Sequence, residues 1–166
     1  MIPTHTLIIG ASAAGLASAA CLQKEGIEYI LLEKYPQVAA KWRDHYDRLH
    51  LHTSKKWSGL PFVQFDRSLA QYPSRQDVVN YLDNYAKELN IHPVFDTEVL
   101  SVKREESRWI SETNNGIYQS EFVIVATGKN HTPVVPGFEG IHSFKGNVLH
   151  SSQYKNGKEF VGKMYW

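Results

Sequence analysis

A glycine-containing turn near the amino terminus constrains the fold more than any other feature of the chain. The turn, residues 10–15 (GASAAG), follows a short apolar run over residues 6–9 and leads into an Ala- and Leu-rich stretch over residues 13–25. That stretch has no proline and is followed by Gly26, so we expect a helix with a glycine at its carboxyl end. A second apolar run over residues 28–33 predicts another strand. Strand, turn, helix and strand together predict a βαβ unit with parallel strands.

The turn matches the dinucleotide-binding pattern GxGxxG at two of its three glycines. Gly10 and Gly15 occupy the first and third positions, which serve the tight turn and the close packing of helix on strand. The free N–H groups and the positive dipole end of the following helix favour phosphate groups. Ser12 occupies the second position, where the backbone approaches a diphosphate. Its side chain either displaces the diphosphate or donates a hydrogen bond to it, and both alternatives stay open.

Glu33 stands at the carboxyl end of the second predicted strand. A carboxylate at this place can accept hydrogen bonds from both ribose hydroxyls of an adenosine and would repel a 2′-phosphate. The pattern therefore favours FAD or NAD over NADP. The alternative is a turn whose glycines serve packing alone, with Glu33 as a surface carboxylate, but the complete βαβ context argues against it.

Composition narrows the function classes further. The chain has 166 residues, of which 42% are hydrophobic, and 18 basic against 17 acidic residues leave a formal net charge of +1. No basic block marks a nucleic-acid or membrane surface, so we expect a small-molecule cofactor and neither of those partners. The single cysteine, Cys21, excludes an internal disulfide and favours a cytoplasmic protein. Its position in the predicted helix indicates a small core residue rather than a nucleophile.

The middle of the chain predicts a long structured connection and a second helix. Residues 34–72 are rich in aromatic side chains but show little periodicity, and connections of this length are usually functional. Residues 75–90 carry apolar side chains at helical spacing, directly after Ser74 as the expected N-cap.

The region after that helix predicts a small antiparallel meander followed by a separate buried strand. A hairpin-type turn at residues 114–116 (NNG) joins the last two of three short strand-like runs, at 98–103, 108–113 and 116–119. The buried strand, residues 121–126, leads into Ala126-Thr127-Gly128. Ligands bind at the carboxyl ends of strands in open α/β sheets, so this turn is a candidate cofactor contact.

The stretch from Phe144 to Tyr154 reads FKGNVLHSSQY, which fits FxGxxxHxxxY. With it, the chain resembles the flavin-containing monooxygenase family, whose fingerprint is FxGxxxHxxx followed by an aromatic residue. The resemblance spans essentially the whole chain in the family's order. It also covers the glycine turn, Glu33, the Trp42 region, residues 46–53 (YDRLHLHT), Tyr72-Pro73 and the Ala126-Thr127-Gly128 turn.

The resemblance implies an α/β fold, an FAD/NAD(P)-binding Rossmann-like domain of the glutathione-reductase type with a small antiparallel β-meander insertion. The implied roles are the FAD diphosphate at the glycine turn, the adenosine ribose at Glu33 with Lys34 beside it, and the adenine at Val99. The implied cofactor-binding residues are Gly10, Ser12, Ala13, Gly15, Glu33, Lys34, Trp42, Val99, Ala126, Thr127 and Gly128. His150 is expected to shape the passage between two nucleotide domains, and no catalytic residue is assigned. His50 and His52 are expected to pack near the flavin; a metal site is the alternative, but no third ligand accompanies them.

In the family, NADPH reduces FAD, and oxygen then forms a hydroperoxyflavin that transfers one oxygen atom to the substrate. This chemistry needs a second glycine-rich turn for NADPH, and the 166 residues contain none. We therefore expect residues 1–166 to form the FAD-binding domain of a monooxygenase-like oxidoreductase, ending before the NADPH-binding domain and inactive alone. One alternative is a non-catalytic FAD-binding module whose partner chain supplies the NADPH domain. Another is a remnant that binds nothing.

Overall fold

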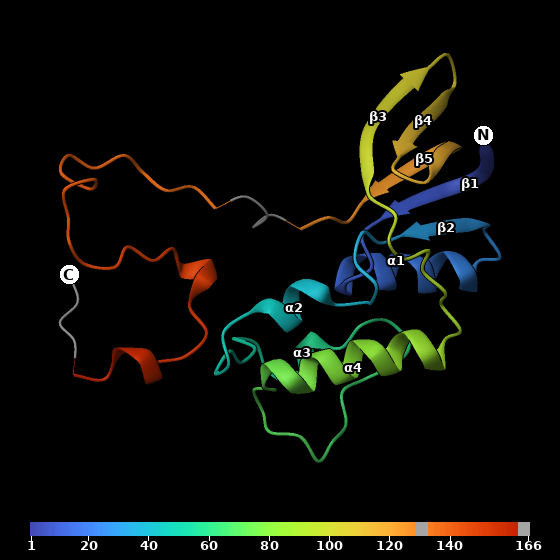
Figure 1. Cartoon of the computed structure of the whole chain (residues 1–166). Coiled ribbons are helices and arrows are strands. Elements are labelled where there is room, and N and C mark those ends of the chain that lie inside the picture. Colours follow the sequence, from blue (N-terminus) through green and yellow to red (C-terminus); the bar gives the residue numbers. More distant parts are fainter. Residues whose placement is uncertain (129–132, 163–166) are drawn as a thin grey trace.

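The computed structural model describes residues 1–128 and 133–162, and its centre is one five-stranded sheet with the order β2-β1-β5-β4-β3 (Figure 1). Strands β2 (Tyr29–Leu32), β1 (Ile2–Ile9) and β5 (Gly116–Val125) run parallel. Strand β4 (Arg108–Thr113) pairs antiparallel with both β5 and β3 (Val99–Glu105). The predicted α/β fold with an antiparallel meander is confirmed.

The predicted βαβ unit is present as β1, α1 (Ala13–Lys24) and β2. Strand β1 lies in the middle of the parallel part, where Leu7 and Ile8 point to opposite faces and are both fully buried. The strand starts at Ile2, earlier than predicted, because its first residues pair with residues 118–120 of β5. Gly26 follows the helix with φ +68°, the left-handed conformation expected just past a helix end.

Strand β5 corrects one prediction. The runs 116–119 and 121–126 are a single strand, not a meander strand followed by a separate buried one. Ser120, at the expected break, pairs with Thr4 of β1 on one side and with Trp109 of β4 on the other. Polar residues at this position interrupt the apolar run without interrupting the ladder, because the backbone groups carry the pairing. The meander and the parallel strands therefore share β5.

Helix α4 (Arg75–Glu88) starts at Ser74 as predicted and ends two residues before the predicted boundary. The Ser74 hydroxyl accepts a hydrogen bond from the Asp77 N–H at 3.2 Å, and the Asp77 carboxylate accepts one from the Ser74 N–H at 2.9 Å. This reciprocal pair is a capping box, which satisfies two otherwise unpaired donors. The apolar face of α4 packs with α1 on one side of the parallel strands (Figure 1).

Residues 34–72 form the predicted long connection, with two short helices, α2 (Ala40–Asp44) and α3 (Lys55–Ser58). Two buried tyrosines of α4 hold it. The Tyr81 hydroxyl donates to the Val63 carbonyl at 2.7 Å, and the Tyr85 hydroxyl donates to the Pro61 carbonyl at 2.9 Å. Burial raises the pKa of Tyr85 to about 12, so this hydroxyl keeps its proton at any physiological pH.

Residues 133–162 run away from the sheet in Figure 1 and form two short 3-10 turns, Ser151–Gln153 and Lys158–Phe160. Lys155 donates to the Asp44 carboxylate at 2.7 Å, which ties the segment to the end of α2. In the FxGxxxH stretch, a Cβ on Gly146 would lie 2.4 Å from the Phe144 ring, so the glycine makes room for the aromatic side chain. Within 1–128 and 133–162, no helix has the length and apolar character needed to cross a membrane.

Candidate cofactor-binding site

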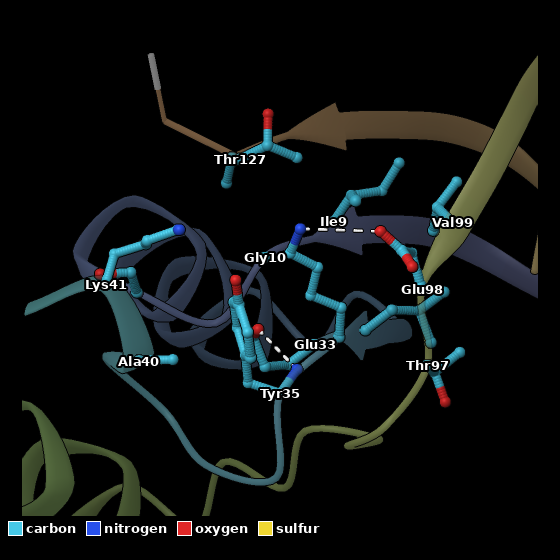
Figure 2. Close-up of a pocket in the computed structure, with 14 residues that line it drawn as sticks. Ile9, Gly10, Glu33, Tyr35, Ala40, Lys41, Thr97, Glu98, Val99 and Thr127 are labelled. Atoms are coloured by element: carbon cyan, nitrogen blue, oxygen red, sulfur yellow. Dashed lines mark hydrogen bonds and ion pairs between the residues drawn. The ribbon is translucent and has the colours of Figure 1, made fainter. Parts of the chain in front are cut away.

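A cavity of about 240 Å³ opens at the carboxyl ends of β1, β2 and β5 (Figure 2). This is the edge at which parallel sheets bind ligands. Five segments far apart in the sequence contribute its lining. These are Ile9, Gly10 and Ser12 at the end of β1 and in the turn after it, Leu32, Glu33, Lys34 and Tyr35 at and after the end of β2, Ala40 and Lys41 of α2, Thr97, Glu98 and Val99 at the start of β3, and Ala126 and Thr127 after β5.

The two glycines of the β1–α1 turn are required by close contacts. A Cβ on Gly10 would lie 2.7 Å from the Ala126 carbonyl oxygen, and φ at Gly10 is +104°. A Cβ on Gly15 would lie 1.8 Å from the Gly10 carbonyl oxygen. A side chain at position 10 would push the turn away from β5. A side chain at position 15 would push α1 away from the turn. The first and third glycines therefore have the packing roles that the GxGxxG pattern predicts.

Ser12 is the N-cap residue of α1, yet its side chain makes no capping hydrogen bond. The first turn of α1 also carries no acidic residue. The N–H groups of this turn have no intrahelical partner, and the positive end of the helix dipole lies here. Since Ser12 lines the cavity, the hydroxyl and the helix start together offer hydrogen-bond donors beside it.

Glu33 is a buried carboxylate with 7% exposure, which excludes the alternative of a surface residue. One oxygen accepts a hydrogen bond from the Ala11 N–H at 2.7 Å. The other accepts one from the Tyr35 N–H at 3.0 Å (Figure 2). Two carboxylate oxygens offer about four acceptor positions, so these contacts fix the orientation of the group and leave acceptor capacity. The carboxylate thus joins the glycine turn to the segment after β2.

Residues 97–99 line one wall of the cavity, and hydrogen bonds from two other segments hold them in place. The Thr97 N–H donates to the Glu33 carbonyl at 2.9 Å. From the β4–β5 turn, Asn114 Oδ1 accepts a hydrogen bond from the Glu98 N–H at 2.8 Å, and Asn115 Nδ2 donates to the Asp96 carbonyl at 2.8 Å. The hairpin turn that the sequence predicts therefore also braces the cavity wall.

Charged groups in the cavity come from two lysines and two glutamates. Lys34 Nζ lies 3.6 Å from the Glu98 carboxylate, so these two lining residues form an ion pair. The Tyr35 ring has Lys34 Nζ at 5.2 Å and Lys41 Nζ at 5.7 Å from its centroid. Such distances allow cation–π attraction to the ring.

A family model for pyridine nucleotide-disulphide oxidoreductases matches residues 7–166. The chain belongs to this family. The predicted resemblance to flavin-containing monooxygenases is also confirmed. The probable indole-3-pyruvate monooxygenase YUCCA4 of Arabidopsis thaliana is 38% identical over 95% of this chain and 39% of its own length. A flavin-containing monooxygenase from Stenotrophomonas maltophilia superimposes with a TM-score of 0.89 and 27% identity, covering 98% of this chain and 49% of that one.

A third solved structure has the same fold. The structure of OTEMO in complex with FAD and NADP has a TM-score of 0.75 and 24% identity, and it covers 93% of this chain and 31% of that one. The curated relatives are longer than this chain, which spans between 39% and 45% of their lengths.

Within the family fold, seven of the predicted cofactor-binding residues line the cavity. They are Gly10, Ser12, Glu33, Lys34, Val99, Ala126 and Thr127. The other four do not line it. Ala13 and Gly15 lie in the first turn of α1, Trp42 is partly buried against the core, and Gly128 follows Thr127 with φ +74°. Their roles toward FAD remain predictions.

Sequence reasoning did not single out several lining residues, namely Ile9, Leu32, Tyr35, Ala40, Lys41, Thr97 and Glu98. Thr97 and Glu98 flank the predicted Val99, so a wider window would have included them. For Lys41 the only signal was its place directly before Trp42.

Two other predictions concern single side chains. Cys21 is exposed, so its assignment to the core is wrong. The buried face of α1 is formed by Gly15, Leu16, Ala19 and Ala20, and Cys21 follows this stripe on the solvent side.

His50 Nδ1 lies 2.8 Å from the Arg48 carbonyl and does not line the cavity. Among the residues that the structure describes, no group of three or more His, Cys, Asp or Glu side chains could hold a metal ion.

Proposed function

We propose that this chain binds FAD in the cavity at the carboxyl ends of β1, β2 and β5, and that residues 1–166 form the FAD-binding domain of an NADPH-using, monooxygenase-like oxidoreductase. The observation that carries the proposal is the buried Glu33 carboxylate, fixed beside the glycine turn with acceptor capacity left. When bound, FAD would supply the redox chemistry for transfer of one oxygen atom, the reaction class that the relatives' names describe.

The residues present fit the adenosine and diphosphate parts of FAD. Side chains are excluded at Gly10 and Gly15, which keeps the backbone of the turn accessible. The start of α1, with no acidic residue in its first turn, suits a diphosphate. Glu33 would accept from the ribose hydroxyls, and its charge would disfavour a 2′-phosphate.

The remaining lining would position the two ends of the cofactor. The start of β3, with Val99, would flank the adenine, while Ala126 and Thr127 after β5 line another part of the cavity. Lys34 would stand beside the adenosine, held by its ion pair with Glu98. These groups bind and orient the cofactor, and none of them is assigned a proton transfer.

NADPH binding would be supplied by residues outside these 166. No second glycine-rich turn occurs in the sequence, and the curated relatives are more than twice as long. A partner chain or a further domain would meet this need equally well.

The test compares FAD with FMN, which carries the same isoalloxazine ring but lacks the adenosine. Titration of the purified chain, followed by quenching of flavin fluorescence, should show binding of FAD and roughly 100-fold weaker binding of FMN, because the cavity contacts are to the adenosine half. Glu33→Gln should weaken FAD binding by about tenfold, since the charged hydrogen bonds to the ribose are lost. Glu25→Gln, at the exposed end of α1, is the matched control and should bind FAD as the unmodified chain does. Equal affinity for FAD and FMN, or no binding of either, would overturn the proposal.

A further inference from the structure

Lys41 brings a positive charge into the cavity from a segment that the nucleotide-binding pattern does not include. It lies on α2, lines the cavity and extends toward the side where Gly10 and Thr127 lie (Figure 2). Lys41 Nζ lies 5.7 Å from the centroid of the Tyr35 ring. A ring face attracts a cation but does not neutralise it.

The carboxylates near Lys41 are engaged by other groups. Glu33 accepts from two backbone N–H groups, and Glu98 pairs with Lys34. Asp44, one turn further along α2, accepts a hydrogen bond from Lys155 at 2.7 Å. This hydrogen bond is the main cause of the lowered pKa of Asp44, and Lys41 adds a weaker attraction to the exposed carboxylate. Among the ion pairs of residues 1–128 and 133–162, none involves Lys41.

A second positive feature lines the same cavity. The start of α1 presents the positive end of a 12-residue helix, without an acidic side chain in its first turn and without a capping bond from Ser12. An ammonium group and a helix amino terminus beside one cavity repel each other, and an anion between them would turn this repulsion into two attractions.

The backbone that carries Lys41 is anchored. The Ala39 N–H donates to the Ala11 carbonyl at 3.1 Å, which ties the start of α2 to the glycine turn. Arg43 Nη2 lies 2.6 Å from both oxygens of Asp83 on α4. Since both ends of α2 are held, the backbone of Lys41 keeps its place beside the cavity that its side chain lines.

From this geometry we infer that Lys41 is a second phosphate contact, pairing with the diphosphate of the bound dinucleotide from the α2 side of the cavity. The inference rests on the proposed function and adds a residue to it. The glycine turn and the α1 dipole hold the diphosphate through N–H groups, and Lys41 adds the only full positive charge that these described cavity residues leave without an ion pair. Lys41 therefore increases the affinity for a nucleoside diphosphate and leaves the affinity for a nucleoside unchanged.

The test uses ADP and adenosine as probes, because they differ only in the diphosphate. Isothermal titration should show that Lys41→Met weakens ADP and FAD binding by about tenfold, the effect of one lost charge-assisted contact, and leaves adenosine binding unchanged. Lys41→Arg should retain most of the ADP affinity. Lys56→Met is the matched control, since Lys56 also lies over an aromatic ring, Trp57, at 5.1 Å but does not line the cavity.

The outcomes separate this inference from the proposed function. If the unmodified chain binds ADP and FAD and Lys41→Met binds them equally well, or weakens adenosine by the same factor, the inference is wrong and the proposed function stands. If the unmodified chain binds neither ligand, the proposed function itself fails. Lys41→Gln is a second neutral variant, and thermal unfolding of each variant identifies any that does not fold. A shallower salt dependence of ADP binding in the neutral variants would add independent support.

Discussion

Ser12 stands where a glycine is expected in the nucleotide-binding turn, and its role decides how this turn meets a diphosphate. The hydroxyl does not cap α1, although serine at an N-cap usually does. It lines the cavity beside the helix start. A side chain that is not used for capping is available as a donor toward an anion. The geometry therefore favours a hydrogen bond to the diphosphate over steric displacement.

Replacing Ser12 by Ala tests this role. We expect FAD affinity to fall by roughly fivefold, the effect of one hydrogen bond, measured by fluorescence titration. The unfolding temperature should stay unchanged because no capping bond is lost. Ser18→Ala removes a hydroxyl from the same helix that donates to the Ala14 carbonyl at 2.9 Å, and it should leave FAD binding as it was. Tighter binding by Ser12→Ala or Ser12→Gly would show that the side chain obstructs the diphosphate.

For single residues, the sequence predicts a role correctly where that role follows from a local pattern. The glycines and Glu33 belong to one contiguous strand–turn–helix–strand unit, so spacing alone locates them. Lys41 and the asparagines of the β4–β5 turn act on the cavity from distant segments, and only the pairing of β3, β4 and β5 brings that turn to the wall. Cys21 was misplaced because an Ala-rich helix has little contrast between its faces.

Among the elements, the β4–β5 turn does more than reverse the chain. Asn114 Oδ1 accepts from the Glu98 N–H at 2.8 Å, and Asn114 Nδ2 donates to the Asp96 carbonyl at 3.1 Å. Asp96 has φ +53°, a conformation that a non-glycine residue adopts only when its surroundings compensate for the strain. The turn thus stabilises the bend that leads into the cavity wall.

Removing these contacts should loosen the wall. We expect Asn114→Ala to weaken ADP and FAD binding by roughly threefold and to lower the unfolding temperature by a few degrees, because two hydrogen bonds to a strained bend are lost. Asn80→Ala, on the exposed side of α4 where it accepts from Gln76 at 2.9 Å, is the control. A variant with unchanged affinity for both ligands would show that residues 96–98 keep their position without the turn.

The elements also show where sequence patterns lose information. The helix after Ser74 was predictable because its capping box and apolar spacing are local. Strand β5 was divided in the prediction because its two halves differ in surroundings. Residues 118–120 pair with β4 as well as β1, whereas residues 122–125 pair with β1. A single strand that serves two sheet environments has no single alternation pattern.

At the scale of the whole molecule, the proposed nucleotide cavity lies at the carboxyl ends of the parallel strands. The buried Glu33 in that cavity disfavours the 2′-phosphate of NADPH, so NADPH is not expected to compete for it. The sequence contains no second glycine-rich turn. FAD binding and reduction by NADPH should therefore be separable properties in this polypeptide.

The corresponding experiment loads the 166-residue chain with FAD and follows the flavin absorbance under anaerobic conditions. We expect added NADPH to leave the oxidised flavin spectrum unchanged over minutes, because the sequence has no second glycine-rich turn to hold NADPH. Dithionite should bleach the same sample, which shows that the bound flavin is redox-active and accessible. Free FAD with NADPH at the same concentrations sets the background rate. Rapid bleaching by NADPH above that background would mean that these residues hold a nicotinamide site without a second glycine turn, and residues 133–162, which run beyond the sheet, would be the first place to look for it.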